Sequence, residues 1–225
     1  MPNYPILHLL ILLLLSPALP AAPAMVSTLS PEEISEYESQ PEVIRKLISE
    51  SLALTRKHLT YLYGSNTPKR GGMDCSGTVQ YILKSQDLHG TPRQADQIHD
   101  WSMRSGTLRE VKTHSLDSHE YDDLRPGDLL FWSGTYGIER AITHVMIYLG
   151  THRESGKPVM VGASDGRSYN GKKRRGVSVF DFRLPRPDSK AKFVGHASTP
   201  GLVEKPNEND RSDRDDRNDG TALVF

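Results

Sequence analysis

The sequence predicts an α+β fold, with N-terminal helices packed on a small antiparallel β-sheet. Helical hydrophobic periodicity dominates residues 31–103, whereas residues 128–196 contain short apolar runs separated by glycines, prolines and charged residues. Helices first and strands later is the order typical of an α+β domain. Hydrophobic residues make up 36% of the 225 residues, which is enough for one modest core.

The helical half begins with a capping signal. Ser30 precedes Pro31, and Glu33 follows three residues after the serine, which is the pattern of an N-cap and a capping box. A second helix is expected from Pro41 to about Tyr61, because apolar residues recur there at helical spacing: Val43, Ile44, Leu47, Ile48, Leu52 and Leu59.

A glycine-rich loop over residues 64–72 precedes a third helix, which is expected to begin at Cys75. The apolar residues that follow lie at i, i+3 and i+4: Val79, Ile82 and Leu83. A fourth helical stretch is expected over Arg93–Met103. Five short strands then follow, each bounded by turn residues: Asp128–Trp132, Thr143–Gly150, Pro158–Ala163, Gly176–Phe182 and Lys192–His196.

The chain divides into four segments. Residues 1–24 are expected to be a signal peptide, because an apolar run ends in small residues with an Ala-x-Ala arrangement. An uncleaved N-terminal anchor is the alternative, since no Lys or Arg precedes the run. Residues 25–60 are interpreted as an N-terminal helical extension, residues 61–200 as the main domain and the charged residues 201–225 as a disordered tail. No later stretch approaches the roughly 20 apolar residues of a spanning helix.

The charge balance argues against several kinds of partner. Lys plus Arg and Asp plus Glu number 28 each, so no net field attracts the chain to nucleic acid or to an anionic membrane surface. The aromatic residues are too scattered for a base-stacking platform. Neither a cysteine cluster nor a histidine pair at i, i+4 occurs, so no metal and no cofactor is expected. The oligomeric state does not follow from the sequence.

Cys75 is the only cysteine, so no intramolecular disulfide can form. It lies between the glycine-rich loop and a helix start, where backbone N–H groups and the helix dipole favour the thiolate. We therefore expect a nucleophile with a pKa below roughly 8.5, the usual value for a thiol. A buried cysteine that serves as a small hydrophobic residue is the alternative.

A thiol nucleophile needs a partner that accepts and returns a proton, and histidine is the usual one. His144 begins the strongest predicted strand, so a sheet would hold its ring rigidly. Most other histidines lie in polar or loop-like stretches. His144 is therefore the candidate general base, with a core histidine bonded to a backbone carbonyl as the alternative.

Four motifs make these residues recognisable. They are Tyr63-Gly64, Met73-Asp74-Cys75-Ser76-Gly77, Arg125-Pro126-Gly127-Asp128-Leu129-Leu130-Phe131-Trp132 and Thr143-His144-Val145-Met146-Ile147-Tyr148-Leu149-Gly150. In their order and approximate spacing they resemble the NlpC/P60 family of cell-wall peptidases, over residues 61–198 of this chain.

The resemblance implies a papain-like fold in which residues 61–200 form the catalytic domain. Cys75 would attack a peptide carbonyl and His144 would shuttle the proton. Tyr63 would bind or polarise the substrate carbonyl, while Asp74 and Ser76 would orient the loop around the nucleophile. The implied protein is an exported cysteine-type peptidase, in the periplasm, cell envelope or medium, that acts as an endopeptidase on peptidoglycan stem peptides.

One position departs from the family pattern. Family members usually carry a third polar residue, often a histidine, on the strand after the base, where it fixes the tautomer of the imidazole. Gly162 occupies the matching place and has no side chain for this task. Ser164, Asp165 and His196 are the candidates for a third catalytic residue, and a backbone carbonyl or a water molecule is a further alternative.

The turn over residues 167–175 carries a run of cations: Lys172, Lys173, Arg174 and Arg175. A solvated turn is one interpretation of this run. Attraction of the carboxylates of a stem peptide beside the cleft is the other.

Two other functions stay open on the sequence alone. A non-catalytic wall-binding or scaffold protein would fit the loss of the polar residue at Gly162, although the presence of Cys75 and His144 argues against it. A thiol amidase or acyltransferase with a non-wall substrate would use the same pair of residues. The sequence offers no pocket signature that excludes it.

Overall fold

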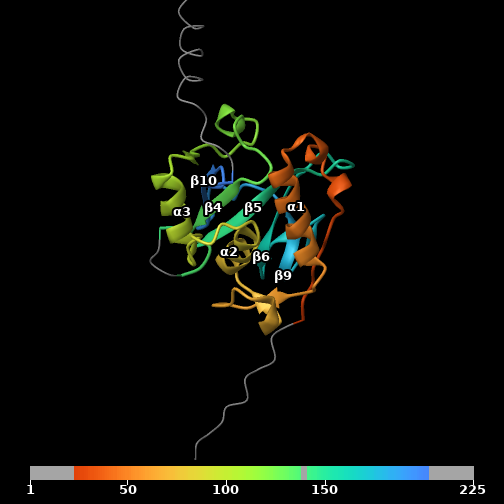
Figure 1. Ribbon diagram of the computed structural model, residues 1–225. Helices are drawn as coiled ribbons and strands as arrows, with labels where there is room; N and C mark the ends of the chain where they lie inside the picture. The colour runs from red at the N-terminus through yellow and green to blue at the C-terminus, as the bar shows by residue number, and fades with distance from the viewer. Residues whose placement is uncertain (1–22, 138–140, 203–225) are drawn as a thin grey trace, which may run out of the picture.

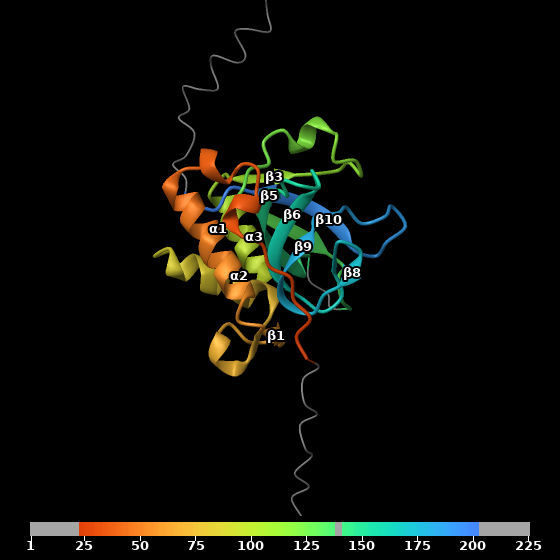
Figure 2. The ribbon, with the colours of Figure 1, turned by 90° about the vertical axis from the view of Figure 1, so that its right-hand side faces the viewer.

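The structure, a computed structural model, describes residues 23–137 and 141–202. The predicted signal peptide up to residue 22 and the predicted tail from residue 203 lie outside these residues. The described chain forms two layers, with three α-helices on one face of a six-stranded sheet (Figures 1 and 2).

The α-helices are short. They are α1 (Glu42–Thr55), α2 (Cys75–Ser85) and α3 (Ala95–Arg104). The described residues also contain four 3-10 turns: η1 Pro31–Glu33, η2 Tyr37–Ser39, η3 Pro68–Arg70 and η4 His119–Tyr121. Before η1, the Ser30 N–H donates to Glu33 Oε2 at 2.7 Å, within the expected capping box. Within residues 23–137 and 141–202, no helix has the length and apolar character needed to cross a membrane.

The central sheet is antiparallel throughout, with the strand order β3-β10-β4-β5-β6-β9. Its strands are β3 Leu108–Glu110, β4 Leu129–Ser133, β5 His144–Thr151, β6 Pro158–Ser164, β9 Gly176–Asp181 and β10 Lys192–Ala197. Two short pairs lie outside it: the parallel pair β1 Thr60–Tyr61 and β2 Gly72–Met73, and the hairpin β7 Ser168–Tyr169 and β8 Lys172–Lys173.

The main core lies between the sheet and the helices. It combines the apolar faces of α1 and α2 with alternate residues of the strands: Leu47, Ile48, Leu52, Val79, Ile82, Leu83, Val145, Ile147 and Val161. Because side chains alternate along a strand, the residues between them face the opposite side. There they form an aromatic cluster with Trp132, Tyr148, Phe180 and Phe182. The central strands are thus buried on both faces.

The predicted fold class is confirmed, since helices pack on an antiparallel sheet. The five predicted strands and the helices at Cys75 and at Arg93 are present within two residues of their expected bounds. These elements carry strong local signals, because their apolar residues repeat at helical or strand spacing.

The end of the second predicted helix is wrong, because α1 ends at Thr55 and does not reach Tyr61. The backbone of His58 has a φ of 51°, which breaks the helical path, and Leu59 turns into the core. Tyr61 then belongs to β1, which pairs with β2 across the glycine-rich loop. Helical periodicity cannot reveal this pairing, because it is a contact between segments separated in sequence.

Residues 25–60 contribute to the same core as the predicted catalytic domain. Leu29 and Ile34 are buried with the residues of α1. Before them, the Met25 N–H donates to the Arg175 carbonyl at 2.9 Å, and the Val179 N–H donates to a backbone carbonyl of the same N-terminal segment. The segment therefore lies along β9 at the edge of the sheet.

Gly77 allows the glycine-rich loop to cross the first turn of α2. A Cβ at this position would lie 2.2 Å from the Ser65 carbonyl oxygen and 2.9 Å from Asn66 Cα. The same carbonyl accepts a hydrogen bond from the Asp74 N–H at 3.0 Å, so the loop backbone is fixed there. A side chain at residue 77 would push the loop away from the helix.

Gly77→Ala is therefore expected to destabilise the protein by about 3 kcal/mol, the upper part of the usual range for over-packing, because backbone atoms cannot move aside as a flexible side chain can. Thermal unfolding followed by circular dichroism measures the change. Gly90→Ala is the matched control, since a Cβ there meets no atom within 4 Å. Equal melting temperatures for Gly77→Ala and the wild type would contradict the close crossing.

Candidate active site

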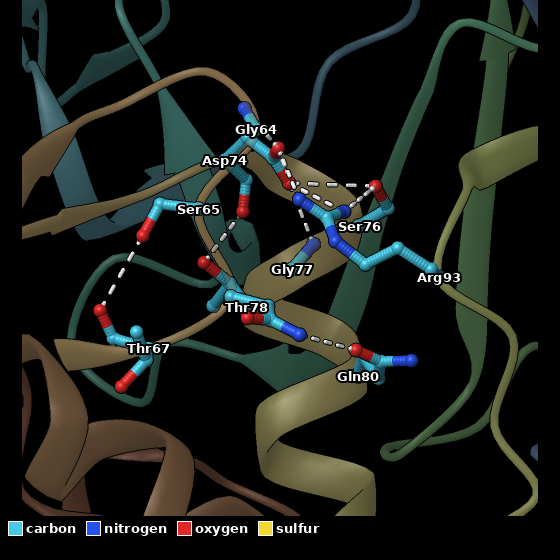
Figure 3. A network of polar contacts seen from close by, with 10 residues as sticks. Gly64, Ser65, Thr67, Asp74, Ser76, Gly77, Thr78, Gln80 and Arg93 are labelled. Carbon is cyan, nitrogen blue, oxygen red and sulfur yellow. Dashed lines mark hydrogen bonds and ion pairs between the residues drawn. The ribbon is translucent and has the colours of Figure 1, made fainter. Parts of the chain in front are cut away.

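Asp74 fixes the start of α2. It is the N-cap residue, and its Oδ1 accepts a hydrogen bond from the Gly77 N–H at 2.7 Å (Figure 3). Its Oδ2 accepts from the Gly64 N–H at 2.8 Å, and the carboxylate is buried. An N-cap side chain satisfies N–H groups that the helix leaves unpaired. The carboxylate thus ties the preceding loop to the helix and sets the position of the next residue, Cys75.

Arg93 neutralises this buried charge. Its Nη2 lies 2.6 Å from Asp74 Oδ2, and its Nη1 donates to Asp74 Oδ1 at 3.0 Å and to Ser76 Oγ at 2.9 Å (Figure 3). A guanidinium that bonds both oxygens of a carboxylate is the strong form of this ion pair. The sequence singles out Asp74 and Ser76 but not Arg93, because Arg93 lies outside every motif.

The Cys75 thiol lies against the start of β5. Cys75 is only 3% exposed, and the backbone N–H of Val145 is close enough to hydrogen-bond to the sulfur. The pairing of β5 with β6 extends from Thr151 only to Ile147, so it stops before this N–H. Val145 directly follows His144. The Cys75 thiol therefore lies beside the residue that follows His144 in the chain.

His144 is held by packing. Its ring meets the Trp132 ring edge-on, with 5.7 Å between the centroids and 61° between the planes, and the register pairs the two residues across β4 and β5. Among the described residues, its buried Nε2 has no hydrogen-bond partner, and no hydrogen bond joins the ring to the Cys75 thiol. Catalytic hydrogen bonds are often long until substrate binds.

Two adjoining hollows open beside this pair. The smaller one has a volume of about 240 Å³ and is lined by Cys75. The larger one, the histidine-side cavity, has a volume of about 580 Å³, and its lining includes His144, Trp132, Ser164, Asp165, Arg167 and Arg183. The two share three tyrosines: Tyr61, Tyr63 and Tyr136. Volumes of this size suit a peptide or another small ligand.

Tyr61 is a functional candidate that the sequence reasoning missed. The register of β1 and β2 places it opposite Met73, two residues before Cys75. Desolvation, followed by the charges of Cys75 and Asp74, raises the pKa of Tyr61, so its hydroxyl stays protonated. The expected tyrosine, Tyr63, is 71% exposed and also lines both hollows. The sequence feature that could have identified Tyr61 is its spacing of two residues from Tyr63, because side chains at this spacing lie on one side of an extended chain.

The place of the third polar residue is filled by a methionine. A Cβ at Gly162 would lie 2.9 Å from Met146 Cγ, so the Met146 side chain occupies that position. Ser164 and Asp165 line the histidine-side cavity with His144, but neither forms a hydrogen bond with the ring. The orientation of the imidazole therefore depends on packing in the free protein.

His196, the remaining candidate, lies elsewhere. Its Nδ1 is 3.3 Å from Asp128 Oδ2, its Nε2 is 3.4 Å from the Glu120 carbonyl oxygen, and its ring stacks on Tyr121. It lines neither hollow. These contacts tie β10 to the segment before β4, so the structure does not bring His196 to the candidate site.

Burial governs the protonation of Cys75 and His144. Desolvation, followed by the charge of Asp74, raises the pKa of Cys75 to about 11, against the lowering effect of backbone N–H groups. The expected low pKa of this thiol is therefore wrong, because the loss of water outweighs the helix start. Desolvation, followed by Arg167, holds the pKa of His144 well below its usual value. Both groups are neutral at neutral pH in the free protein.

Arg167 is the cation of the 167–175 turn that faces the site. Its guanidinium carbon lies 4.1 Å from the centre of the Trp132 ring, the ring that also contacts His144. Lys172 and Lys173 are exposed instead. The sequence reasoning missed Arg167 because it precedes the run of four cations that drew attention to this turn.

The residues at the site offer no metal centre. Within residues 23–137 and 141–202, no group of three or more His, Cys, Asp or Glu side chains is placed to hold a metal ion. The chemistry that the arrangement supports is nucleophilic attack by sulfur.

Two solved structures resemble the fold. A protein of the NLP/P60 family from Staphylococcus aureus subsp. aureus Mu50, described as similar to lipoprotein, has 20% identity and a TM-score of 0.46, over 71% of this chain and 42% of that chain. NlpC2 from Trichomonas vaginalis has 19% identity and a TM-score of 0.42, over 71% of this chain and 50% of that chain.

Sequence comparison identifies the family. Gamma-DL-glutamyl hydrolase from Bacillus subtilis (strain 168) is 27% identical over 159 residues, which are 71% of this chain and 30% of that protein, so the chain spans under a third of the relative's length. The NlpC/P60 family model matches residues 58–174, more than half of the chain and including Cys75 and His144. The resemblance found in the sequence is therefore confirmed, and the chain belongs to the NlpC/P60 family, whose members are typically cysteine hydrolases of the cell wall.

Proposed function

We propose that this chain is an exported cysteine endopeptidase that cleaves peptidoglycan stem peptides, with Cys75 as nucleophile and His144 as general base. The observation that carries the proposal is the meeting of α2 and β5, where the N–H of Val145 approaches the Cys75 sulfur and His144 is the preceding residue. The two adjoining hollows support it, because they offer space for a peptide on both sides of this pair. Export rests on the sequence of residues 1–24 alone.

The proposed reaction starts from the neutral pair. As the Cys75 sulfur attacks the carbonyl carbon, His144 takes the thiol proton, so charge forms only as the S–C bond forms. Nδ1 is the proposed acceptor, because Nε2 is enclosed by protein. The tetrahedral intermediate then breaks its C–N bond, His144 gives the proton to the leaving amine, and a thioester remains. Water, deprotonated by His144, attacks the thioester and releases the carboxylic acid and the thiol.

Two donors are proposed for the oxyanion of the tetrahedral intermediate. The first is the backbone N–H of Cys75, which already favours the thiolate and lies at the positive end of α2. The second is the hydroxyl of Tyr61, which is kept protonated by its raised pKa. Tyr61 thus takes the role that the sequence assigned to Tyr63.

Packing takes the place of a third polar residue in this proposal. Trp132 restrains the ring of His144 from one side, and the backbone of β5 fixes the position of the His144 Cα atom. A ring oriented only by packing keeps its tautomer less firmly than a ring with a hydrogen-bonded Nε2. A modest rate is therefore expected for this enzyme.

A non-catalytic peptidoglycan-binding protein is the second candidate. The observation that favours it is the buried Nε2 of His144, which has no hydrogen-bond partner among the described residues. In that case the hollows would serve binding alone. A thiol amidase or acyltransferase would use the same pair, and the chemical nature of the products distinguishes it from a peptidase.

Purified muropeptides are expected to be cut by the protein lacking residues 1–24, and not by Cys75→Ala or His144→Gln, which should lose roughly 10³-fold or more in rate. Tyr61→Phe should lose about 10²-fold in kcat, the usual cost of one oxyanion donor, and Tyr63→Phe much less. Mass spectrometry of the products measures the cleavage and identifies the bond.

Sedimentation with purified cell walls is the control for binding. Cys75→Ala should still sediment, because it removes only the sulfur. A wild-type protein that sediments but cuts nothing would favour the scaffold candidate. A larger loss in Tyr63→Phe than in Tyr61→Phe would contradict the assignment of Tyr61.

Cys75 is expected to react with iodoacetamide at a rate that rises with pH from neutrality towards pH 11, because the raised pKa leaves little thiolate at lower pH. His144→Gln should leave this profile nearly unchanged, since a neutral imidazole does not stabilise a thiolate. Intact-mass measurements at each pH give the rate. A plateau below about pH 8, as for an activated thiolate, or a large upward shift in His144→Gln would contradict the neutral pair.

A further inference from the structure

The 167–175 turn is held by the N-terminal end of the described chain. Met25 pairs with Arg175 in an antiparallel bridge, where each backbone N–H donates to the carbonyl of the other residue at 2.9 Å. Two residues further on, Ser27 Oγ accepts a hydrogen bond from Arg174 Nε at 2.5 Å. The N-terminal end therefore contacts the last two residues of this turn through both backbone and side-chain hydrogen bonds.

Residues 25–27, the N-terminal strap, are in turn bound to the sheet. The Ser27 N–H donates to Ser178 Oγ at 2.8 Å, and the Val179 N–H donates to the Ser27 carbonyl at 2.9 Å. Ser178 is fully buried on β9, and Figure 2 shows the chain near its N-terminus, in red, beside this strand. The Ser27 hydroxyl is thus a fixed acceptor for the guanidinium of Arg174.

One backbone hydrogen bond carries this contact to the active site. The Arg174 N–H donates to the Arg167 carbonyl at 2.8 Å, which closes the base of the turn. At its tip, the Asn170 N–H donates to Asp181 Oδ1 at 3.1 Å. The guanidinium carbon of Arg167 lies 4.1 Å from the centre of the Trp132 ring, at the wall of the histidine-side cavity. The strap and β9 therefore set the position from which the Arg167 side chain reaches the cavity.

The charge of Arg167 acts on both reacting groups. Desolvation lowers the pKa of His144, and the charge of Arg167 lowers it further. Desolvation also lowers the pKa of Arg167, and the charge of Cys75 opposes this lowering, so the guanidinium and the thiolate attract each other. Such effects weaken as the distance between the charges increases. Displacement of the turn would therefore change the reactivity of Cys75.

We propose that Ser27 is a positioning residue, which through Arg174 keeps Arg167 at the active site. The site is then complete only in a chain that retains the N-terminal strap. This inference goes beyond the proposed function, because it concerns the shape of the site and holds for any substrate. A cut after residue 27 in place of residue 24 would remove no residue of the main core, yet it would release the turn.

Alkylation of Cys75, the only cysteine, by iodoacetamide tests this link without a substrate. At a pH below the pKa of the thiol, Arg167→Gln is expected to slow the reaction about tenfold, because loss of a nearby cation raises a thiol pKa by about one unit. Ser27→Ala should slow it about threefold, the effect of one modest hydrogen bond. In the Arg167→Gln background, Ser27→Ala should have no effect, because residues that act through one group are not additive.

Two further variants serve as controls for the alkylation rate. Ser27→Thr keeps the hydroxyl and should keep the wild-type rate. Ser39→Ala should also keep it, since Ser39 is exposed and its hydroxyl donates to the Glu36 carbonyl instead. Equal slowing by Ser27→Ala with and without Arg167 overturns the inference, because that effect would bypass the guanidinium. A wild-type rate in Ser27→Ala overturns it as well. Circular dichroism verifies that each variant is folded.

The fluorescence of Trp132 reports the position of Arg167. Trp101 is the only other tryptophan, so all variants are compared in the Trp101→Phe background. Trp132 is fully buried beneath the guanidinium, so acrylamide should quench it weakly. Ser27→Ala, and more strongly a chain that begins at Thr28, should raise the quenching constant towards that of Arg167→Gln. An unchanged constant in the trimmed chain contradicts the role of the strap.

Turnover of purified muropeptides separates this inference from the proposed function. Ser27→Ala should lower kcat/KM about threefold when Arg167 is present and leave it unchanged in Arg167→Gln, because the cation stabilises charge on the sulfur. Equal kcat/KM for the wild type and Ser27→Ala overturns the inference and leaves the proposed function standing. A wild type that cleaves nothing contradicts the proposed function, and the alkylation rates still decide whether Ser27 positions Arg167.

Discussion

The carboxylate of Asp74 is the interaction on which the geometry of the site depends. This buried carboxylate accepts hydrogen bonds from the Gly77 N–H in the first turn of α2 and from the Gly64 N–H in the glycine-rich loop. It also forms an ion pair with Arg93, which lies just before α3. Removal of any partner would leave part of a buried charge unsatisfied, which is costly. The same charge raises the pKa of the neighbouring Cys75. The group that positions Cys75 therefore also opposes ionisation of its thiol, and the proposed reaction accordingly has a base remove the proton during attack.

Trp132 organises the other half of the site. Its ring contacts His144 at one side and the guanidinium of Arg167 over its face, while Phe182 and Phe193 pack around it. A large aromatic ring that is fully buried has little freedom to move. The side chains of His144 and Arg167 are thus held relative to each other by one ring. This arrangement explains how the site keeps its geometry without a polar residue at position 162.

The sequence predicted the parts of the fold and the site that depend on local pattern. The start of α2 at Cys75 and the strand that begins at His144 follow from capping and apolar spacing. Tyr61 and Arg167 were missed because their importance arises from β1 pairing with β2 and from a side chain turning inward. The direction of the pKa shift of Cys75 was wrong because burial, which depends on the whole fold, outweighs the local helix start.

The central claim is that Cys75 forms a thioester with the acyl part of the substrate, and hydroxylamine tests it most directly. Hydroxylamine competes with water for a thioester even when that intermediate does not accumulate. The account predicts that digestion of stem peptides in its presence yields the hydroxamate of the acyl fragment in place of the free acid, and that Cys75→Ala yields neither. Free acid alone at every hydroxylamine concentration would contradict a covalent role for Cys75.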